Sequence, residues 1–330
     1  MSGIKINPLD NVEVELNSGH KKALFSIKKG EPVIKYGYPI GYATKDIKKG
    51  QRVHIDNLST NLKNNSDYTY NPSITPLDKG INISFMGYIR ESGEVGIRND
   101  IWIINTVGCV NKIAEKLAAL TGAFAFPHPF GCSQLGDDHD ITQKILKNLV
   151  HHPNAGGVLV LGLGCENNNI PSFKKILGTV DEKRVKFLNC QESEDEIEEG
   201  LQLIQELQKQ AASFRRKKVP ISKLKVGLKC GGSDGFSGIT ANPLVGHFSN
   251  QLIASGGTTV LTEVPEMFGA ETILMNRCMD NSVFEKTVNL IQQYKEYFIR
   301  HNQVIYENPS PGNKEGGIST LEEKSLGCIQ

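Results

Sequence analysis

Residues 229–243 read KCGGSDGFSGITANP, and this glycine-rich stretch decides how the rest of the chain is interpreted. A short apolar run from Leu224 to Leu228 precedes it, and residues 243–255 have the spacing of an amphipathic helix. A strand, a glycine-rich turn and a helix in this order predict free backbone N–H groups at the helix start, where a carboxylate or phosphate can bind. The same residues could simply form a tight turn and a helix cap, because neither the dinucleotide fingerprint nor the phosphate-loop pattern is present.

Strands and helices alternate from residue 81 onward, on both sides of this stretch. Apolar runs predict strands at residues 83–90, 100–108, 123–126, 156–164, 185–188, 224–228 and 258–263. Helical spacing predicts helices at residues 111–120, 141–151, 171–177, 194–217, 243–255 and 282–301. The alternation indicates an α/β body with a mainly parallel sheet whose ligand groups lie at the carboxyl ends of the strands.

The first part of the chain has a different pattern. Residues 1–61 hold short β segments divided by Gly, Pro and Lys-Gly pairs, which predicts a small all-β domain. Within it, SIKKGEPVIKYG at 26–37 and DIKKGQRVHIDN at 46–57 resemble each other, which indicates a duplication or two similar β corners. Residues 62–80 are rich in Asn, Ser, Pro and Asp and predict an extended linker. An α/β middle domain is then expected at 81–220 and a second α/β domain at 221–330.

Composition places the chain among ordinary globular proteins. Its 37 basic and 36 acidic residues give a net charge of +1, so neither nucleic acid nor a membrane surface is an expected partner. No apolar run is long enough to cross a bilayer and the N-terminus lacks the apolar core of a signal peptide, so we expect a cytoplasmic protein. The seven cysteines show no CxxC spacing, which predicts neither a disulfide framework nor a zinc ribbon. Cys109 and Cys278 are interpreted as buried small hydrophobes.

Reactive side chains gather where predicted strands end. In chain order they are His128, Cys132, Gln134, Asp137, Asp138 and His139; Cys165 and Glu166; Cys230, Ser233, Asp234 and Asn242; and Glu263, Glu266 and Glu271. Such imidazole, carboxylate and thiolate groups could hold Fe(II) or Mn(II), which acts as a Lewis acid while a histidine or lysine removes a proton. Each group alone could equally be a cap, a turn or a surface carboxylate, and we adopt that interpretation for Asp137, Asp138 and Glu271. Cys132, Cys165 and Cys230 also permit an iron–sulfur cluster, although their spacing carries no cluster motif.

Longer segments carry a resemblance to a known family. In the first domain they are SGHK at 18–21, VIKYGYPIGYA at 33–43 and VHIDN at 53–57. In the rest of the chain they are GYIRESGEVGIRN at 87–99, FPHPFGCSQLGDDH at 126–139, HPNAGGVLVLGLGCENN at 152–168, the glycine-rich stretch itself and TEVPEMFGAE at 262–271. Through these segments the chain closely resembles the altronate/galactarate dehydratase family over nearly its whole length.

The resemblance implies a domain organisation. Residues 1–61 look like an SAF-type β-clip domain, residues 81–220 like a dimerising middle domain and residues 221–330 like the first part of a Rossmann-like catalytic domain. Members of the family continue further at the C-terminus and carry an extra hairpin between Leu16 and Ser18, so we expect this chain to be C-terminally incomplete. The resemblance also implies a soluble, homodimeric, Fe(II)- or Mn(II)-dependent enzyme of hexuronate catabolism.

On this resemblance the expected reaction is elimination of water from a sugar acid, D-altronate giving 2-dehydro-3-deoxy-D-gluconate, with VHIDN favouring altronate over galactarate. His128, Cys132 and Asp234 are expected to be catalytic, with His128 transferring the proton. The metal is expected on Cys132, Cys165, Cys230 and Glu266, and substrate contacts are expected from His20, His54, Gly231, Gly232, Ser233 and Asn242. The alternatives are a lyase of the same family acting on galactarate or sulfolactate, and a non-catalytic carbohydrate-binding protein that needs no metal.

Overall fold

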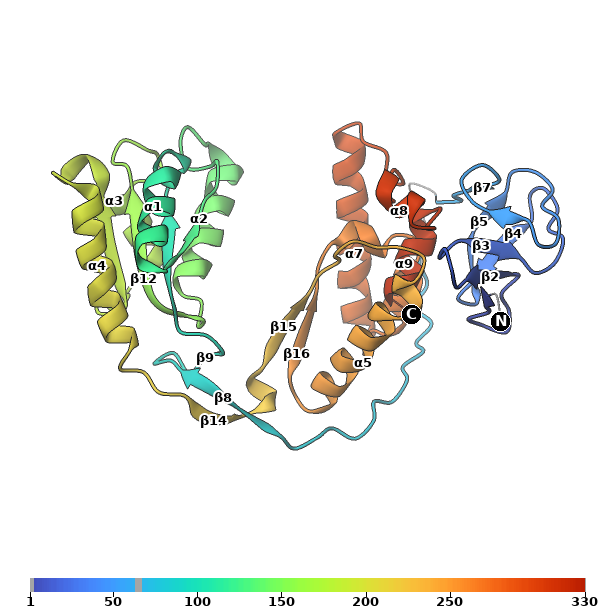
Figure 1. Cartoon of the computed structure of the whole chain (residues 1–330), viewed down its shortest axis with the longest axis horizontal. Coiled ribbons are helices and arrows are strands. Elements are labelled where there is room, and N and C mark those ends of the chain that lie inside the picture. Colours follow the sequence, from blue (N-terminus) through green and yellow to red (C-terminus); the bar gives the residue numbers. More distant parts are fainter. Residues whose placement is uncertain (1–2, 63–66, 330) are drawn as a thin grey trace. The chain divides into compact units, whose positions relative to one another are not determined.

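The computed structural model describes residues 3–62 and 67–329, so residues 63–66 of the predicted linker lie outside the described residues. The chain forms two compact units (Figure 1). One joins residues 1–81 to residues 225–330 and is called the composite unit; the other, the middle unit, spans residues 82–224. The fold is mixed α/β with a small β domain at the N-terminus, as the sequence predicts.

The N-terminal β domain consists of two small antiparallel sheets. The first has the order β1 (Gly3–Ile4), β2 (Val12–Glu15), β3 (Lys21–Ala23) and β6 (Arg52–Val53). The second has the order β4 (Pro32–Lys35), β5 (Tyr38–Ala43) and β7 (Leu58–Ser59). Alternate residues of the strands point into a shared apolar core that contains Val12, Val33, Ile40 and Val53.

The two similar segments of this domain form two similar turns. Lys28 N–H donates to Glu31 Oε2 at 2.7 Å, and Lys48 N–H donates to Gln51 Oε1 at 2.9 Å. Ile27 and Ile47 meet in an antiparallel bridge between the turns. The sequence similarity therefore corresponds to two equivalent β corners.

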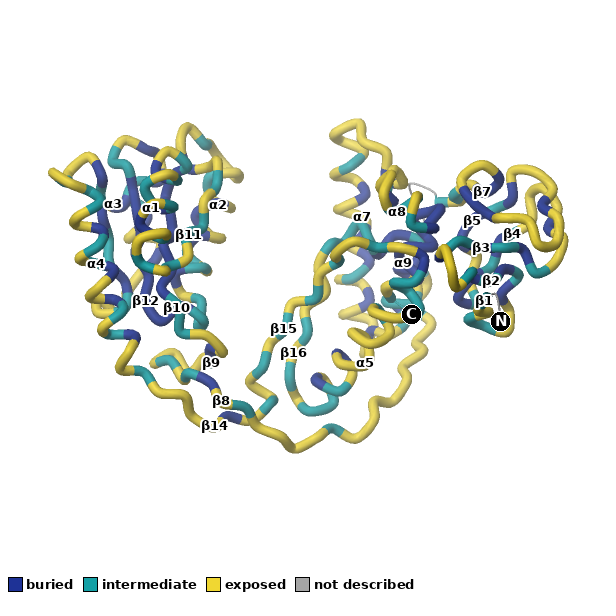
Figure 2. The backbone as a smooth tube through the Cα atoms, viewed as in Figure 1, coloured by how far each residue is buried: buried dark blue, intermediate teal, exposed yellow. Residues whose placement is uncertain are grey.

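A four-stranded parallel sheet organises the middle unit. Its order is β11 (Phe124–Phe126), β10 (Asp100–Asn105), β12 (Ala155–Gly162) and β13 (Val185–Asn189). Every residue of β12 is buried, as expected for a strand covered on both faces (Figure 2). A small antiparallel sheet of β14 (Lys217–Pro220), β8 (Ser84–Ile89) and β9 (Val95–Gly96) completes the unit.

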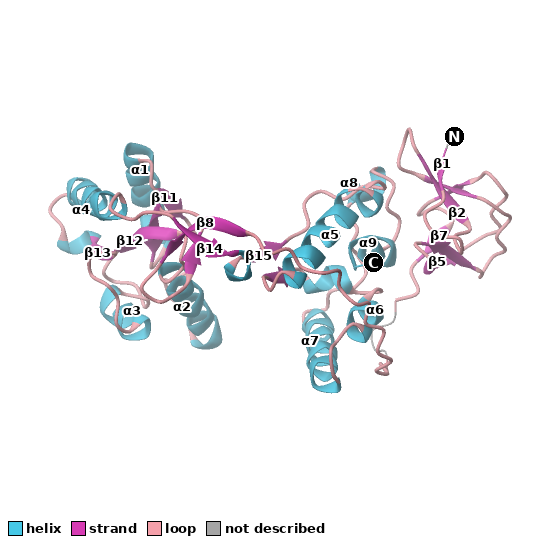
Figure 3. Cartoon of the chain, turned by 90° about the horizontal axis from the view of Figure 1, so that it is seen from below, coloured by secondary structure: helices cyan, strands magenta, loops and turns pink. Residues whose placement is uncertain are grey.

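Helices cover both faces of the parallel sheet. Helices α1 (Asn111–Thr121) and α4 (Glu196–Ala211) pack on one face, where Leu117 and Ile204 join the core around Leu159. Helices α2 (Gly136–Val150) and α3 (Ile170–Leu177) pack on the other face, against Trp102 and Val158 (Figure 3). The result is a three-layer α/β/α sandwich, which agrees with the predicted α/β body.

Three details of the middle unit differ from the sequence prediction. Helix α2 begins at Gly136 rather than Ile141, because the acidic Asp137 and Asp138 occupy its first turn and stabilise a helix N-terminus. Helix α4 ends at Ala211 rather than near residue 217, since the following basic residues form strand β14 against β8. Cys109 is exposed rather than buried.

The α/β part of the composite unit is built on two parallel strands. Strands β15 (Lys225–Leu228) and β16 (Thr258–Leu261) pair in parallel and are connected by the 3-10 turn η4 (Ser237–Ile239) and helix α5 (Ala241–Ala254). The chain continues through η5 (Val264–Met267), α6 (Glu271–Asn276), α7 (Asn281–Arg300) and α8 (Pro311–Glu315). Within the described ranges, no helix has the length and apolar character that crossing a bilayer requires.

Helix α9 (Leu321–Ile329) was not predicted from the sequence, yet it lies at the centre of the composite unit. Figure 2 shows the helix as mostly buried, and its buried residues run from Leu321 to Gly327. Three of them, Glu322, Glu323 and Lys324, are charged. Leu326 packs in the core of the β domain, and the helix also contacts η5 and η4. The helix therefore ties the β domain to the carboxyl ends of β15 and β16.

Candidate functional site

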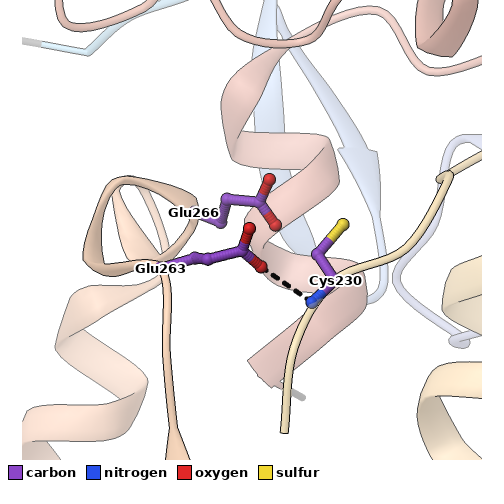
Figure 4. Close-up of side chains that lie close together, drawn as sticks. All are labelled: Cys230, Glu263 and Glu266. Carbon is purple, nitrogen blue, oxygen red and sulfur yellow. Dashed lines mark hydrogen bonds between the residues drawn. The ribbon is translucent and has the colours of Figure 1, made fainter. Parts of the chain in front are cut away.

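A thiol and two carboxylates meet at the carboxyl ends of β15 and β16. Cys230 follows β15, Glu263 follows β16 and Glu266 lies in η5. One ligand atom from each of the three lies within 4.8 Å of the others (Figure 4). Because the two strands are parallel neighbours, their ends meet at one edge and bring together residues 33 positions apart.

Glu263 reaches this position through a rare backbone conformation. Its φ of 61° and ψ of 60° are left-handed, which costs a residue with a side chain about 1–3 kcal/mol. The carboxylate accepts the N–H of Cys230 at 2.7 Å and lies 3.2 Å from Lys229 Nζ. Burial raises the pKa of Glu263, but the Cys230 N–H and Lys229 outweigh it, so the pKa lies below its ordinary value and the group is a carboxylate.

The other two members have their own partners. Lys324 of α9 donates to Glu266 Oε1 at 2.6 Å and to Asn308 Oδ1 at 3.2 Å. Cys230 Sγ lies 3.3 Å from Ser233 Oγ, and burial raises the pKa of the thiol. The buried ammonium of Lys324 partly balances the negative charge of the cluster.

The glycine-rich turn lies next to this cluster. Asp234 Oδ1 accepts the N–H groups of Phe236 and Ser237 at 2.9 and 3.0 Å, so this carboxylate holds the turn. Asn242 Nδ2 donates to the carbonyl of Gly327 in α9 at 2.9 Å. Gly231 and Gly232 are exposed, and a Cβ at either would meet nothing within 4 Å, so their backbone is open to a ligand.

The β domain meets the same turn through glycines. A Cβ on Gly235 would overlap the carbonyl of Gly19, and Gly235 N–H donates to the carbonyl of Gly316 at 2.7 Å. The residue after Gly19 is His20, whose ring lies 5.3 Å from the ring of His54, edge to face. The predicted β-domain histidines are thus neighbours of each other, on a domain that contacts the turn.

A buried ion network lies beneath these histidines. Glu323 of α9 accepts Lys21 Nζ and Lys35 Nζ, each at 2.8 Å, and all three side chains are at most 1% exposed. Burial lowers the pKa of Lys21 to about 8, while the two lysines hold the pKa of Glu323 at about 2 in spite of its burial. Lys21 also donates to Ser319 Oγ at 3.0 Å, and Ser319 Oγ lies 2.9 Å from His54 Nδ1.

The remaining predicted site residues belong to the middle unit. His128 Nε2 lies 2.8 Å from the carbonyl oxygen of Asn105, and its Nδ1 accepts Phe130 N–H at 3.2 Å, so both ring nitrogens have backbone partners. Cys132 and Cys165 are exposed, on loops that the Asn167 side chain joins by donating to the carbonyl of Gln134. Gln134 Oε1 in turn accepts Gly131 N–H at 2.9 Å, and His139 is partly buried.

Glu166 has a structural environment in the middle unit. It is buried and accepts the Thr106 hydroxyl at 2.6 Å and the N–H groups of Leu163 and Gly164. Burial raises its pKa, but these hydrogen bonds outweigh burial and keep the pKa below its ordinary value. The group therefore joins the carboxyl ends of β10 and β12.

The sequence predictions for three carboxylates and for Cys278 can be compared with the structure. Asp137 and Asp138 lie in the first turn of α2, as expected for helix-end residues. Glu271 was expected in a cap, in a turn or at the surface. It lies in the first turn of α6 and accepts the N–H of Gly269. The surface alternative is wrong, because the side chain is 6% exposed and pairs with Lys295 Nζ at 2.8 Å. Cys278 is buried as expected.

Sequence reasoning missed the groups that α9 and its lead-in contribute. These are Asn308, Asn313, Ser319, Glu323 and Lys324. The only local signal was a run of polar residues after NPSPGNKEGG, which also fits an exposed tail. Their importance emerges from contacts with residues that are far away in the sequence.

The cluster chemistry fits a divalent transition metal. The sulfur of Cys230 and two carboxylates are a mixed soft and hard donor set that could hold a divalent transition metal, and three protein ligands leave coordination positions open. Of the predicted ligands, the structure places Cys230 and Glu266 in this cluster, while Cys132 and Cys165 belong to the middle unit. Glu263 completes the group.

Three family profiles match the chain. They are "Altronate/galactarate dehydratase SAF domain" at residues 11–61, "D-galactarate dehydratase/Altronate hydrolase, second domain" at 87–212 and "D-galactarate/Altronate dehydratase, C-terminal" at 221–330. The chain is 54% identical to the altronate dehydratase of Bacillus subtilis, over 97% of this chain and 67% of that protein. It is 50% identical to the altronate dehydratase of Escherichia coli (100% and 74% covered) and 30% identical to the galactarate dehydratase (L-threo-forming) of Escherichia coli (99% and 71% covered).

Proposed function

The chain belongs to the D-galactarate/altronate dehydratase family, and we propose that it is a hydro-lyase that converts D-altronate to 2-dehydro-3-deoxy-D-gluconate. The observation that carries this proposal is the similarity over the whole chain to two altronate dehydratases, at 54% and 50% identity. The galactarate dehydratase, at 30% identity, is more distant. The enzyme is therefore a carbon–oxygen lyase of the sugar-acid class, with altronate as the preferred substrate.

The elimination breaks two bonds of the sugar acid. A base takes the proton from C2, and the C3 hydroxyl leaves with a proton as water while the C2–C3 double bond forms. The resulting enol takes up a proton at C3 and becomes the 2-keto acid, so no oxidant or reductant is needed. Negative charge builds up on the carboxylate during proton removal, and oriented N–H donors stabilise it.

Cys230, Glu263 and Glu266 would hold the Fe(II) or Mn(II), which when bound supplies a Lewis acid for the carboxylate and a hydroxyl of the substrate. The support is the proximity of the three ligand atoms and the strained backbone of Glu263, since such strain is concentrated at functional sites. Lys324 orients Glu266 through its hydrogen bond. Cys132 and Cys165 are retained as further candidate ligands from the middle unit.

The glycine-rich turn would bind the substrate carboxylate. Its support is the open backbone at Gly231 and Gly232 and the neighbouring Ser233 hydroxyl, 3.3 Å from Cys230 Sγ. Asp234 shapes the turn through its hydrogen bonds, and Asn242 fixes the turn against α9. In this arrangement Asp234 and Asn242 orient the turn.

His20 and His54 would contact the substrate hydroxyls from the β domain. The contact between Gly19 and Gly235 supports this role, because it brings the residue next to His20 against the glycine-rich turn. Burial lowers the pKa of His54, and the positive charges of Lys21 and Arg52 lower it further, to about 4. The ring is therefore neutral. A neutral ring can donate one hydrogen bond to a hydroxyl oxygen.

His128 stays a candidate for proton transfer. Both of its ring nitrogens have backbone partners, so transfer by this side chain requires that one of those bonds break. A His128→Gln variant tests the role directly. Loss of turnover with unchanged melting temperature supports proton transfer, and unchanged turnover assigns the ring to holding the Phe130 loop.

We also propose that the protein forms a homodimer through the middle unit. The support is exposed apolar side chains at the sheet edge and along α2, namely Phe124, Leu135, Ile141 and Ile145. Ile141 and Ile145 are one helical turn apart and share a face. Light scattering should give a dimer that Ile145→Lys weakens, and a monomeric unmodified protein would contradict this part of the proposal.

Substrate choice is tested by assaying the 2-keto-3-deoxy acid formed from D-altronate or galactarate, and the pyruvate and sulfite formed from sulfolactate, which has no C3 hydroxyl to lose. Each assay uses anaerobically reduced protein with Fe(II) or Mn(II). The proposal expects turnover of D-altronate at least about tenfold above the other acids, which is about 1.4 kcal/mol of discrimination. Preference for galactarate would keep the reaction class and change the substrate. Ligand binding without product, in the presence of either metal, would favour the carbohydrate-binding alternative.

A further inference from the structure

We propose that Ser319 and Lys21 are positioning residues for His54, holding its imidazole as the neutral tautomer that carries hydrogen on Nε2. The inference rests on the proposed function, in which His54 contacts the substrate, and it assigns a task to two residues outside the predicted site. Ser319 lies just before α9 and Lys21 lies on β3. Both are buried within the composite unit.

Lys21 determines which groups donate and which accept in these hydrogen bonds. Its ammonium lies 2.7 Å from the Gly317 carbonyl oxygen, 3.0 Å from Ser319 Oγ and 2.8 Å from Glu323 Oε2. An ammonium has three N–H donors and no acceptor, so each of these contacts is a bond that Lys21 donates. The lysine side chain is 0% exposed, so these donors face protein groups rather than bulk solvent.

The Ser319 hydroxyl links Lys21 to the His54 ring, and its acceptor role toward Lys21 determines its role toward the ring. Its oxygen accepts from Lys21, and its other neighbour in the described structure is His54 Nδ1 at 2.9 Å. The hydroxyl hydrogen therefore has His54 Nδ1 as its acceptor, because Lys21 can accept nothing. If Nδ1 carried the ring hydrogen instead, the buried Ser319 hydroxyl would have no acceptor for its own hydrogen. Folded proteins rarely leave a buried hydroxyl without a hydrogen-bond partner.

The charges around His54 favour the neutral ring. Lys21 and Arg52 face it from the β domain together with the His20 ring, and all three oppose a second proton. Glu323 of α9 acts in the opposite direction, but it is paired with two lysines. A neutral ring with Nδ1 occupied presents Nε2–H as a donor, which is the form that can bind a substrate hydroxyl oxygen.

The helix that follows Ser319 offers a matched control. Ser325 is also fully buried, but its hydroxyl has no hydrogen-bond partner in the described structure. Ser319→Ala removes the link to His54, whereas Ser325→Ala removes a hydroxyl of the same kind from the same region. Ser319→Thr keeps the hydroxyl and serves as the rescue variant.

The test is ¹⁵N NMR of the full chain labelled at histidine, with the His54 signals assigned by their loss in His54→Gln. The unmodified protein should show His54 as the Nε2–H tautomer from pH 6 to 7, where Lys21, with a pKa of about 8, is an ammonium. Ser319→Ala should give shifts averaged between the two tautomers, while Ser325→Ala and Ser319→Thr should keep the original spectrum. On D-altronate, Ser319→Ala should lower kcat by about tenfold with little change in KM, as expected for a residue that orients a site group.

Several results would overturn the inference. One is an Nδ1–H tautomer in the unmodified protein, which needs no variant to fold. Another is an unchanged His54 spectrum in Ser319→Ala, or an equal change in Ser325→Ala. The NMR result is independent of turnover, so an inactive protein with the expected tautomer would contradict the proposed function and leave the positioning intact.

Discussion

Lys21 Nζ lies 2.8 Å from Glu323 Oε2, and this ion pair joins residues that are 302 positions apart at a site with almost no solvent exposure. Lys35 binds the other carboxylate oxygen at the same distance. A single glutamate therefore holds two buried lysines, and it fixes α9 to the β domain. The same helix turns Lys324 toward the Cys230 cluster, so the network and the candidate site share one element.

Removing the shared carboxylate charge should be costly. Glu323→Gln leaves Lys21 and Lys35 buried without a counter-charge, and we expect the free energy of unfolding to fall by about 3–5 kcal/mol. Asp46→Asn is the control, because it breaks an exposed pair with Lys28 at 3.5 Å and should leave the free energy of unfolding nearly unchanged. Urea unfolding followed by circular dichroism measures both values, and equal losses would contradict the importance of the buried network.

The Glu323 carboxylate should make the free energy of unfolding depend on pH. The pKa of Glu323 is about 2 in the folded protein and about 4.5 ordinarily, so the unfolded chain binds a proton first as the pH falls. Its contribution is complete above about pH 5 and declines between about pH 5 and pH 2. Urea midpoints measured between pH 6 and pH 3 should fall less steeply for Glu323→Gln than for the unmodified protein, and parallel curves would refute this assignment.

The contact between the β domain and the glycine-rich turn can be tested with glycines. Gly235→Ala places a methyl group against the Gly19 carbonyl, where backbone must shift, so we expect a loss of about 1–3 kcal/mol. Gly232→Ala adds the same methyl group in open space and should leave the melting temperature nearly unchanged. If both variants melt alike, the β domain does not pack on the turn as described.

The middle unit has its own buried carboxylate. Thr106→Val removes the hydroxyl that Glu166 accepts at 2.6 Å, and we expect a loss of about 1.5–3 kcal/mol, as for hydrogen bonds to charged groups. Thr179→Val, at an exposed position of the same unit, is the control. The melting temperature of each variant measures the effect. If Thr106→Val melts at the same temperature as the control, the backbone N–H donors alone stabilise the buried Glu166 carboxylate.

The groups of the candidate cluster could be found from sequence because the rule that locates them is local. Cys230 and Glu263 each follow a short apolar run, and parallel strands bring such ends to one edge. The sequence did not distinguish which strand ends would be neighbours. The predicted ligands Cys132 and Cys165 lie in the middle unit, and their role as further ligands stays a proposal.

Helix α9 could not be found in this way. Its sequence, LEEKSLGCI, places Glu322, Glu323 and Lys324 at buried positions, whereas periodicity treats charged residues as the exposed face of a helix. Their burial depends on partners such as Lys21 and Glu266, which only tertiary structure brings close. The burial of Glu271 was missed for the same reason, since its partner Lys295 lies on a different helix.

The most direct test of the whole account is the turnover of D-altronate by chelator-treated protein as Mn(II) is added, comparing the unmodified chain with Glu263→Gln and with the exposed control Glu285→Gln. The account predicts that the unmodified chain and Glu285→Gln regain 2-dehydro-3-deoxy-D-gluconate formation with metal. Glu263→Gln should need about tenfold more metal or more to reach the same rate, or remain inactive. Turnover that survives the chelator, or a Glu263→Gln variant that responds to Mn(II) as the control does, would contradict a metal site at Cys230, Glu263 and Glu266.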